Sequence, residues 1–345
     1  MKTGASEFMD KTINLMEVCG THTMAIARHG LRKLFPKNVK MLSGPGCPVC
    51  VTPIEDIDKA IEIGKIRNVI LTTFGDMLHV PGSRSSLEAE RAKGADIRVV
   101  YSPHDALDTA IANPDKEVVF VGVGFETTSP TIAATVLAAK KHNVKNFSVI
   151  PMFKTVPKAL KAILEIKDRK IDGFLLPGHV STIIGAKPYA FVAKKYGVPG
   201  VIGGFEPKDI LDSVAMLVEM IKSGKPSIKI QYARSVTENG NKAAQGIMKK
   251  VFRESDANWR AIGPIPGTGY GFSKSFAAFD ASRKFKVKTP PAREPKGCAC
   301  GEILLGLKTP AQCVLFGKAC SPAHAVGPCM VSSEGACAAA YKYGL

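Results

Sequence analysis

Between Lys11 and Ser223 the sequence alternates short runs of β-branched and other apolar residues with longer amphipathic stretches. This alternation is typical of repeated strand–helix–strand units, which form parallel sheets. We therefore predict an α/β protein with two similar, Rossmann-like parallel-sheet domains that face a cleft, followed by a cysteine-rich C-terminal domain. The predicted strands are Asn14–Val18, Val39–Leu42, Val69–Thr73, Arg98–Val100, Val118–Val123, Phe147–Ile150, Gly173–Leu176 and Gly200–Ile202. The predicted helices are Thr23–Leu34, Ile54–Lys65, Ser85–Lys93, Asp105–Asn113, Ile132–Lys141, Val156–Glu165, Pro188–Tyr196 and Pro207–Ser223.

The predicted domain boundaries divide the chain in sequence order. Residues 9–115 form the first α/β domain, residues 116–223 the second, and residues 224–345 a connector with the C-terminal domain. From Asp256 onward, clusters of Gly and Pro break any long element, so this part is interpreted as the connector. Residues 1–8 are interpreted as an appended segment and are left out of the fold prediction.

Composition excludes several classes of protein. The sequence has no uninterrupted apolar run of membrane-spanning length and no signal-peptide pattern, which predicts a cytoplasmic protein without a membrane segment. The formal charge of +17 raises the question of nucleic-acid binding. The basic residues are spread along helix faces rather than interleaved with aromatic residues, so we predict an acidic protein partner or anionic small molecules instead.

Nine cysteines fall into two groups, with none between them. Clustered thiols in a large intracellular chain favour metal binding or redox chemistry over a disulfide framework. The late spacing begins with a Cys-x-Cys pair and lacks the two Cys-x-x-Cys pairs typical of zinc, so an iron–sulfur cluster is favoured, while zinc and disulfides stay open. The early group is Cys19, Cys47 and Cys50, and the late group is Cys298, Cys300, Cys313, Cys320, Cys329 and Cys337.

The early cysteines lie in loops that follow predicted strands. Cys47 and Cys50 form a Cys-x-x-Cys motif, which near a βαβ pattern predicts a dithiol–disulfide couple; half of a zinc site is the alternative. Cys19 precedes a helix, whose N-terminus is expected to lower the pKa of its thiol. With His22, it is a candidate metal ligand or nucleophile, although a plain N-cap loop is equally consistent with the spacing.

Four acidic or imidazole side chains, Asp76, Glu126, His179 and Glu206, lie beside glycine at the ends of predicted strands. The carboxyl ends of parallel strands share one edge, where ligands bind, so these residues are candidates for acid–base or hydrogen-bonding roles. Helix capping explains each carboxylate individually.

Five motifs resemble those of the HypD family of hydrogenase maturation proteins, and the resemblance extends from Met16 to Gly344. They are Met-Glu-Val-Cys-Gly-Thr-His-Thr-Met at 16–24, Gly-Pro-Gly-Cys-Pro-Val-Cys at 44–50, Gly-Phe-Glu-Thr-Thr at 124–128, Pro-Gly-His-Val-Ser at 177–181 and Gly-Pro-Cys-Met-Val-Ser-Ser-Glu-Gly-Ala-Cys at 327–337.

The resemblance implies a scaffold that, with a HypC-type chaperone, holds the Fe(CN)2CO unit of [NiFe]-hydrogenases and receives cyanide from a HypE-type donor. Carried onto this sequence, Cys19 is the iron ligand with His22 beside it, and Cys47 and Cys50 are a redox pair facing the same cleft. The resemblance also implies a [4Fe-4S] cluster in the tail and a second thiol pair. The implied cluster ligands are Cys298, Cys313, Cys320 and Cys337, which leaves Cys300 and Cys329 as the pair.

Two other functions fit part of the pattern. An iron–sulfur oxidoreductase acting on a small molecule in the interdomain cleft uses the same cysteines. A zinc-stabilised binding module keeps the tail but gives the early cysteines no role.

Overall fold

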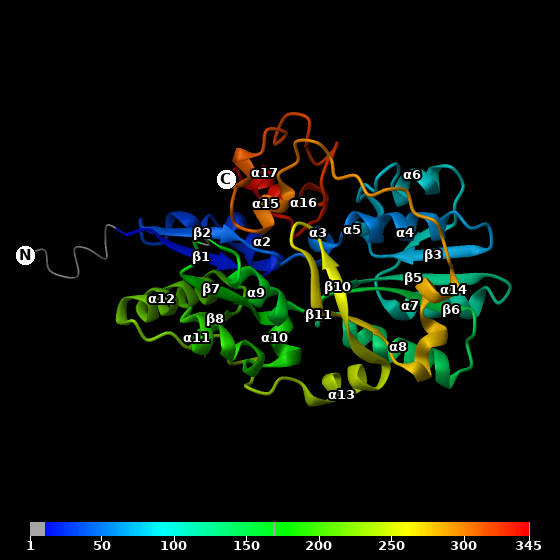
Figure 1. The fold of residues 1–345 in the computed structure, drawn as a ribbon, viewed down its shortest axis with the longest axis horizontal. Helices are drawn as coiled ribbons and strands as arrows, with labels where there is room; N and C mark the ends of the chain where they lie inside the picture. Colours follow the sequence, from blue (N-terminus) through cyan, green and yellow to red (C-terminus); the bar gives the residue numbers. More distant parts are fainter. Residues whose placement is uncertain (1–10, 168–169, 345) are drawn as a thin grey trace, which may run out of the picture.

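The computed structural model describes residues 11–167 and 170–344. The segment interpreted as appended, and the first two residues of the first predicted domain, lie outside the described residues. The described chain is an α/β protein with two separate parallel sheets, here called sheet A and sheet B. The two sheets lie side by side in Figure 1, and the C-terminal segment, coloured orange and red, lies above and between them. The predicted α/β class with parallel sheets is confirmed.

Sheet A has five strands, and every neighbouring pair is parallel. Their order is β2 (Val39–Ser43), β1 (Ile13–Glu17), β7 (Gly173–Pro177), β8 (Gly200–Gly203) and β9 (Ile228–Ile230). Strand β1 therefore pairs with β7, which follows it by more than 150 residues in the chain.

Sheet B has four strands, again all parallel. Their order is β4 (Ile97–Val99), β3 (Val69–Thr73), β5 (Glu117–Gly124) and β6 (Phe147–Phe153). All residues of β3, and all of β5 except Glu117, are buried. Burial on both faces explains why these strands appear in the sequence as continuous apolar runs instead of alternating patterns.

All eight predicted strands and all eight predicted helices correspond to elements of the structure. Within the described ranges, no helix is both long enough and apolar enough to cross a membrane. The helices of the α/β part are α2 (Gly20–Arg28), η1 (Leu31–Lys33), α3 (Pro48–Val51), α4 (Ile54–Gly64), α5 (Gly75–Leu78), α6 (Leu87–Ala92), α7 (Pro103–Ala112), α8 (Ser129–Lys141), α9 (Val156–Leu164), α10 (Gly178–Ile184), η2 (Lys187–Tyr189), α11 (Ala190–Tyr196) and α12 (Pro207–Ser223).

The sheets do not follow the sequential division expected at residue 115. Sheet A combines strands of residues 13–43 with strands of residues 173–230, and sheet B combines strands from both sides of residue 115. The chain thus leaves sheet A after β2, completes sheet B, and returns to sheet A at β7. The loop at residues 44–50, between β2 and sheet B, is therefore a crossing point between the two sheets.

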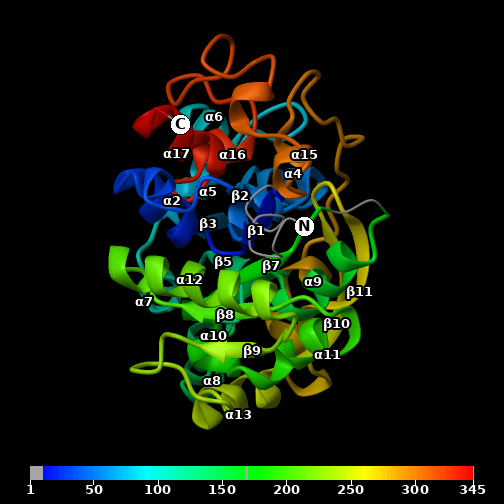
Figure 2. The same ribbon diagram turned by 90° about the vertical axis from the view of Figure 1, so that its left-hand side faces the viewer.

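The segment interpreted as a connector differs from the expectation. Residues on both sides of Asp256 form an antiparallel hairpin, β10 (Phe252–Trp259) and β11 (Gly263–Phe272), with an irregularity between Ser255 and Ala257. The hairpin stands between the two sheets in Figure 1, and Figure 2 shows it from the side. Proline is tolerated in edge strands and beside bulges, which is why a Pro- and Gly-rich sequence forms strands here.

The remaining elements are short. They are α13 (Lys242–Val251), η3 (Lys274–Phe279), α14 (Ala281–Lys284), α15 (Cys300–Leu304), η4 (Pro310–Gln312), α16 (Pro328–Val331) and α17 (Ala336–Tyr343). The last four belong to the cysteine-rich tail and carry or flank its thiols. Buried residues of this tail share one apolar core with residues of both sheets.

Candidate functional site

Cys19 lies directly between β1 and α2, where it is the N-cap residue in an extended conformation. Its loop packs on the loop at residues 44–46, because the backbone N–H of Gly20 donates to the carbonyl of Gly46 at 3.0 Å. A Cβ on Gly46 would lie 2.5 Å from the Cα of Cys19, so only glycine permits this approach. The contact places the Cys19 loop beside the Cys-x-x-Cys turn.

The expected lowering of the pKa of Cys19 is wrong. The side chain is 7% exposed, and burial raises the pKa of its thiol to about 12, with a further contribution from the charge of Glu334. Backbone and side-chain hydrogen bonds from His22 and Thr21 act in the opposite direction but are weaker. Desolvation disfavours the charged form of a thiol, and here it exceeds the effect of the helix N-terminus.

His22 is fully buried and lies one turn into the same helix. Its Nε2 is 2.9 Å from the carbonyl of Gly204, an acceptor only, so Nε2 carries the proton. Its Nδ1 has no hydrogen-bond partner among the described residues. Burial lowers the pKa of His22 to about 4, which leaves the ring neutral. Both His22 and His179 pack against Phe205, with ring centroids 4.9 and 3.9 Å away, and the ring of His179 is stacked while that of His22 is tilted.

The Cys-x-x-Cys motif forms the first turn of α3, with Cys47 as the N-cap. The sulfur atoms of Cys47 and Cys50 lie 2.7 Å apart, and the backbone N–H of Cys50 donates to Cys47 Sγ at 3.2 Å. Burial raises the pKa of Cys50, but its side-chain hydrogen bonds with Cys329 and Cys47 and the charge of Arg260 outweigh it, so the net shift is downward. Burial shifts the pKa of Cys47 in the opposite direction, upward.

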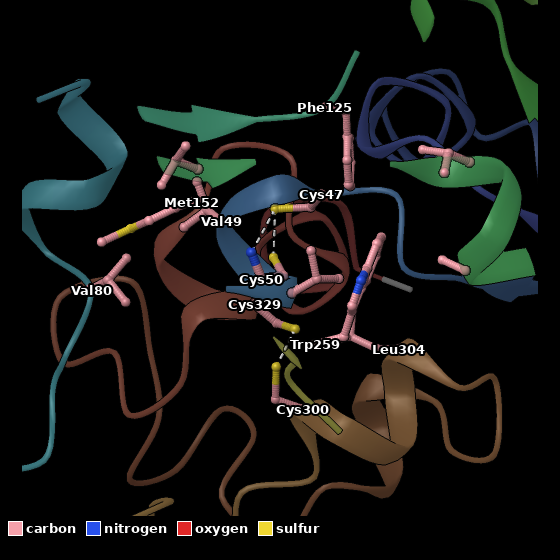
Figure 3. Packing of buried hydrophobic residues seen from close by; sticks show 14 of the residues in the cluster. Cys47, Val49, Cys50, Val80, Phe125, Met152, Trp259, Cys300, Leu304 and Cys329 are labelled. Carbon is pink, nitrogen blue, oxygen red and sulfur yellow. Dashed lines mark hydrogen bonds between the residues drawn. The ribbon is translucent and has the colours of Figure 1, made fainter. Parts of the chain in front are cut away.

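The tail brings a second pair of sulfur atoms to this turn. Cys329 lies within hydrogen-bonding reach of Cys50, and its Sγ lies 2.6 Å from the Sγ of Cys300. Figure 3 shows the sulfur atoms of Cys47, Cys50, Cys329 and Cys300 following one another in a line as two joined pairs within the apolar core, beside Trp259. All four cysteines are at most 5% exposed. The arrangement suits exchange of a disulfide between two neighbouring dithiols.

Of the other four tail cysteines, Cys337 lies in the first turn of α17, and Cys298, Cys313 and Cys320 lie outside the helices. Burial raises the pKa of Cys298 to about 12, with contributions from the charges of Cys300, Cys313 and Cys337, so these thiols occupy one small region. Cys320 accepts a hydrogen bond from the backbone of Val326 at 3.4 Å. Within the described part of the chain, no group of three or more His, Cys, Asp or Glu side chains is arranged around a single metal ion.

Asp76 anchors the tail to sheet B. It lies in the first turn of α5, directly after β3, and its Oδ2 accepts hydrogen bonds from the hydroxyl of Ser332 at 3.1 Å and from the backbone and hydroxyl of Ser333 at 2.9 and 3.0 Å. In the same tail segment, the carboxylate of Glu334 accepts a hydrogen bond from the hydroxyl of Thr21 at 2.7 Å. Asp76 therefore holds in place the tail segment, residues 332–334, that packs on the Cys19 loop.

Glu126 lies elsewhere, at the end of β5. It is 2% exposed, accepts a hydrogen bond from the backbone of Val156 at 3.0 Å, and borders a cavity of about 400 Å³ that Tyr270 and Lys158 also line. Burial raises the pKa of Glu126 to about 8. Glu206, by contrast, forms the capping box at the start of α12.

Sequence reasoning missed several residues of this site. Ser332 and Glu334 lie inside the quoted motif at 327–337, so the Ser-Ser-Glu tripeptide was the available signal. Arg260 directly follows β10, in the part of the sequence that predicts a connector, and its side chain is 3% exposed. No local pattern marks its approach to Cys50.

The fold and the site together define a cysteine-rich α/β protein in which a C-terminal tail carries thiols onto a Cys-x-x-Cys turn between two parallel sheets. The chain belongs to the HypD family: the family model HypD, described as "Hydrogenase formation hypA family", matches residues 2–344. Hydrogenase maturation factors HypD from Rhodobacter capsulatus and Escherichia coli K12 are each 45% identical over 97% of this chain and 90% of their own length. A putative hydrogenase expression/formation protein from Methanocaldococcus jannaschii is 40% identical over 98% of this chain and 94% of its own length. The predicted family is confirmed.

Proposed function

We propose that this protein is a cytoplasmic scaffold on which the Fe(CN)2CO unit of [NiFe]-hydrogenases is assembled, together with a HypC-type chaperone and a HypE-type cyanide donor. The observation that carries the proposal is the buried line of four sulfur atoms that joins the tail to the turn beside Cys19. Membership of a hydrogenase maturation family supports the same assignment.

Cys19 is the proposed thiolate ligand of the iron cargo. Since burial holds its pKa near 12, the thiol stays protonated at neutral pH and loses its proton only when iron binds. The hydrogen bonds from the N-terminal turn of α2 then stabilise the thiolate. The bare Nδ1 of neutral His22 is available as a hydrogen-bond acceptor or as a metal ligand on the same helix.

The line of sulfur atoms moves two electrons by thiol–disulfide exchange. The thiolate of Cys50 attacks the sulfur of Cys329 in a Cys300–Cys329 disulfide, and Cys300 leaves as the thiolate. The Cys47 thiol then loses its proton, which a released tail thiolate takes up, and attacks Cys50, which releases Cys329. The net result is a Cys47–Cys50 disulfide and a reduced Cys300–Cys329 dithiol, and the reverse sequence reduces the first pair. The lowered pKa of Cys50 fits its role as attacking group.

Four tail cysteines remain to hold a resident [4Fe-4S] cluster, namely Cys298, Cys313, Cys320 and Cys337. Four thiolates are the usual donor set of such a cluster, and the charge effects of Cys313 and Cys337 on Cys298 fit convergence of these thiols on one small volume. When bound, the cluster supplies single electrons. Cys313, Cys320 and Cys337 are buried in the apolar core shared with the two sheets, whereas Cys298 is partly exposed.

The first test is infrared and visible spectroscopy of the anaerobically purified protein, coexpressed with its HypC-type and HypE-type partners. The proposal predicts cyanide and carbonyl bands together with the brown colour of a cluster. We expect Cys19→Ala to abolish the infrared bands and retain the cluster, and Cys313→Ala to bleach the cluster. A coloured protein without these bands would instead indicate an oxidoreductase, and a colourless zinc protein would indicate a binding module.

A further inference from the structure

Ser332 occupies a junction between the Cys-x-x-Cys turn and the loop that covers Cys19. Its side chain is 1% exposed, and its hydroxyl oxygen makes three hydrogen bonds. It accepts from the Cys47 thiol at 3.3 Å and from the backbone N–H of Glu334 at 3.2 Å, and it donates to Asp76 at 3.1 Å. A serine hydroxyl has one proton and two lone pairs, so this set saturates it.

One of these three bonds depends on the redox state of Cys47. The thiol donates its proton to Ser332, and a Cys47–Cys50 disulfide has no proton to donate. Oxidation therefore leaves a buried lone pair of Ser332 without a partner, which is unfavourable inside a protein. The other two bonds of the hydroxyl do not involve sulfur. Ser332 thus stabilises the dithiol form selectively.

The same tail segment covers the Cys19 loop. Glu334 lies so close to Gly20 that a Cβ there would be 2.8 Å from the carbonyl oxygen of Glu334, and its carboxylate accepts the hydroxyl proton of Thr21 at 2.7 Å. The backbone N–H of Glu334 is itself held by Ser332. A change at Ser332 is therefore passed directly to the residue that contacts the Cys19 loop at Gly20 and Thr21.

We propose that Ser332 is a positioning residue that couples the redox state of the Cys47–Cys50 pair to the accessibility of Cys19. In the dithiol state Ser332 is fully bonded, the tail segment is held on Asp76, and Glu334 covers Gly20. In the disulfide state the segment loosens, and Cys19 becomes accessible to an incoming iron species. The biological role of this coupling rests on the proposed function. The coupling itself involves the thiols and the tail segment alone and needs no bound iron.

Coupling between two sites is reciprocal. If oxidation opens the cover over Cys19, then weakening the cover favours oxidation of the pair. The reaction to be followed is reduction of the Cys47–Cys50 disulfide, in which the S–S bond accepts two electrons and two protons to give two thiols. In the test the electrons come from dithiothreitol, which is oxidised to its cyclic disulfide.

The experiment compares the unaltered protein with Ser332→Ala and Ser333→Ala. Both variants lose one hydroxyl bond to Asp76, but only Ser332 contacts Cys47. Each protein is equilibrated in dithiothreitol buffers of graded ratio, quenched with acid and alkylated, and the state of each cysteine is read by peptide mass spectrometry. We expect Ser332→Ala to shift the equilibrium towards the disulfide three- to tenfold, about 15 to 30 mV for this two-electron couple, and Ser333→Ala to shift it less than twofold.

The second readout is the rate at which Cys19 reacts with an alkylating reagent. In the unaltered protein and in Ser333→Ala, we expect Cys19 to react at least threefold faster when the Cys47–Cys50 pair is oxidised. In Ser332→Ala the two rates should be equal. Equal rates in the unaltered protein, or an unchanged equilibrium in Ser332→Ala, would overturn the coupling. Neither readout uses iron, so missing cyanide and carbonyl bands would refute the scaffold function without affecting this result.

Discussion

Glu126 provides a quantitative test of how burial acts in this protein. Its carboxyl has a folded-state pKa of about 8 against an ordinary value of 4.5, because it is fully buried, and hydrogen bonds from the backbone N–H groups of Glu126 itself and of Val156 offset the desolvation only in part. Above pH 4.5 the unfolded chain ionises this group while the folded protein keeps it neutral. The folded state therefore loses relative stability as pH rises towards 8, and the loss levels off above that value.

The magnitude follows from linkage between protonation and folding. With these two pKa values, the group costs the folded state about 1 kcal/mol at pH 5 and about 4 kcal/mol at pH 8. Glu126→Gln has a similar shape, keeps one acceptor for Val156 and does not titrate. We therefore expect the variant to gain about 3 kcal/mol relative to the unaltered protein between pH 5 and pH 8.

The assay is urea unfolding at the two pH values, analysed by linear extrapolation. Glu219→Gln, on the exposed face of α12, is the matched control and should follow the pH dependence of the unaltered protein within about 0.5 kcal/mol. An identical pH dependence for Glu126→Gln and the unaltered protein would show that the carboxyl is ionised in the fold, and that the reasoning from burial is wrong.

Two further changes test the packing around the site. Gly46→Ala should lower the free energy of unfolding by about 3 kcal/mol or more and expose Cys19 to alkylation, because the new Cβ clashes with backbone atoms that have no alternative rotamer. Gly246→Ala in α13 is the control: its Cβ has open space, so it should raise the free energy of unfolding by roughly 0.5–1 kcal/mol. Trp259→Phe should cost about 1–3 kcal/mol in thermal unfolding, because the buried hydrogen bond from its Nε1 to Thr268 at 2.9 Å is lost.

The strands were predictable because parallel sheets leave a strong local signature. A strand such as Val69–Thr73 is buried on both faces, and its β-branched run is visible without knowledge of its partners. The assignment of strands to sheets was not predictable in this way. Pairing of β1 with β7 depends on contacts between segments far apart in the chain, and no property of either strand alone encodes it.

The site shows the same division between local and long-range information. Helix starts and a Cys-x-x-Cys spacing are local, so the placement of Cys19 at a helix N-terminus and the contact between Cys47 and Cys50 could be anticipated. The pKa of Cys19 could not, since it depends on how deeply the folded chain buries the thiol. The helix N-terminus favours thiolate, but desolvation by burial has the larger effect, and the charge of Glu334 in the tail adds to it.

The tail explains why the early and late cysteines must be considered together. The two pairs of cysteines lie in small elements. Cys47 and Cys50 belong to a four-residue helix and its N-cap, and Cys300 and Cys329 belong to a thiol-rich tail. Neither element alone could bury enough apolar surface to hold its sulfur atoms in place. Packed together with Trp259 and residues of both sheets, they form part of one core. Burial also slows attack by external thiols on these sulfur atoms, so exchange along the line is faster than exchange with solvent. The position of each pair in the core therefore makes the other pair its accessible reaction partner.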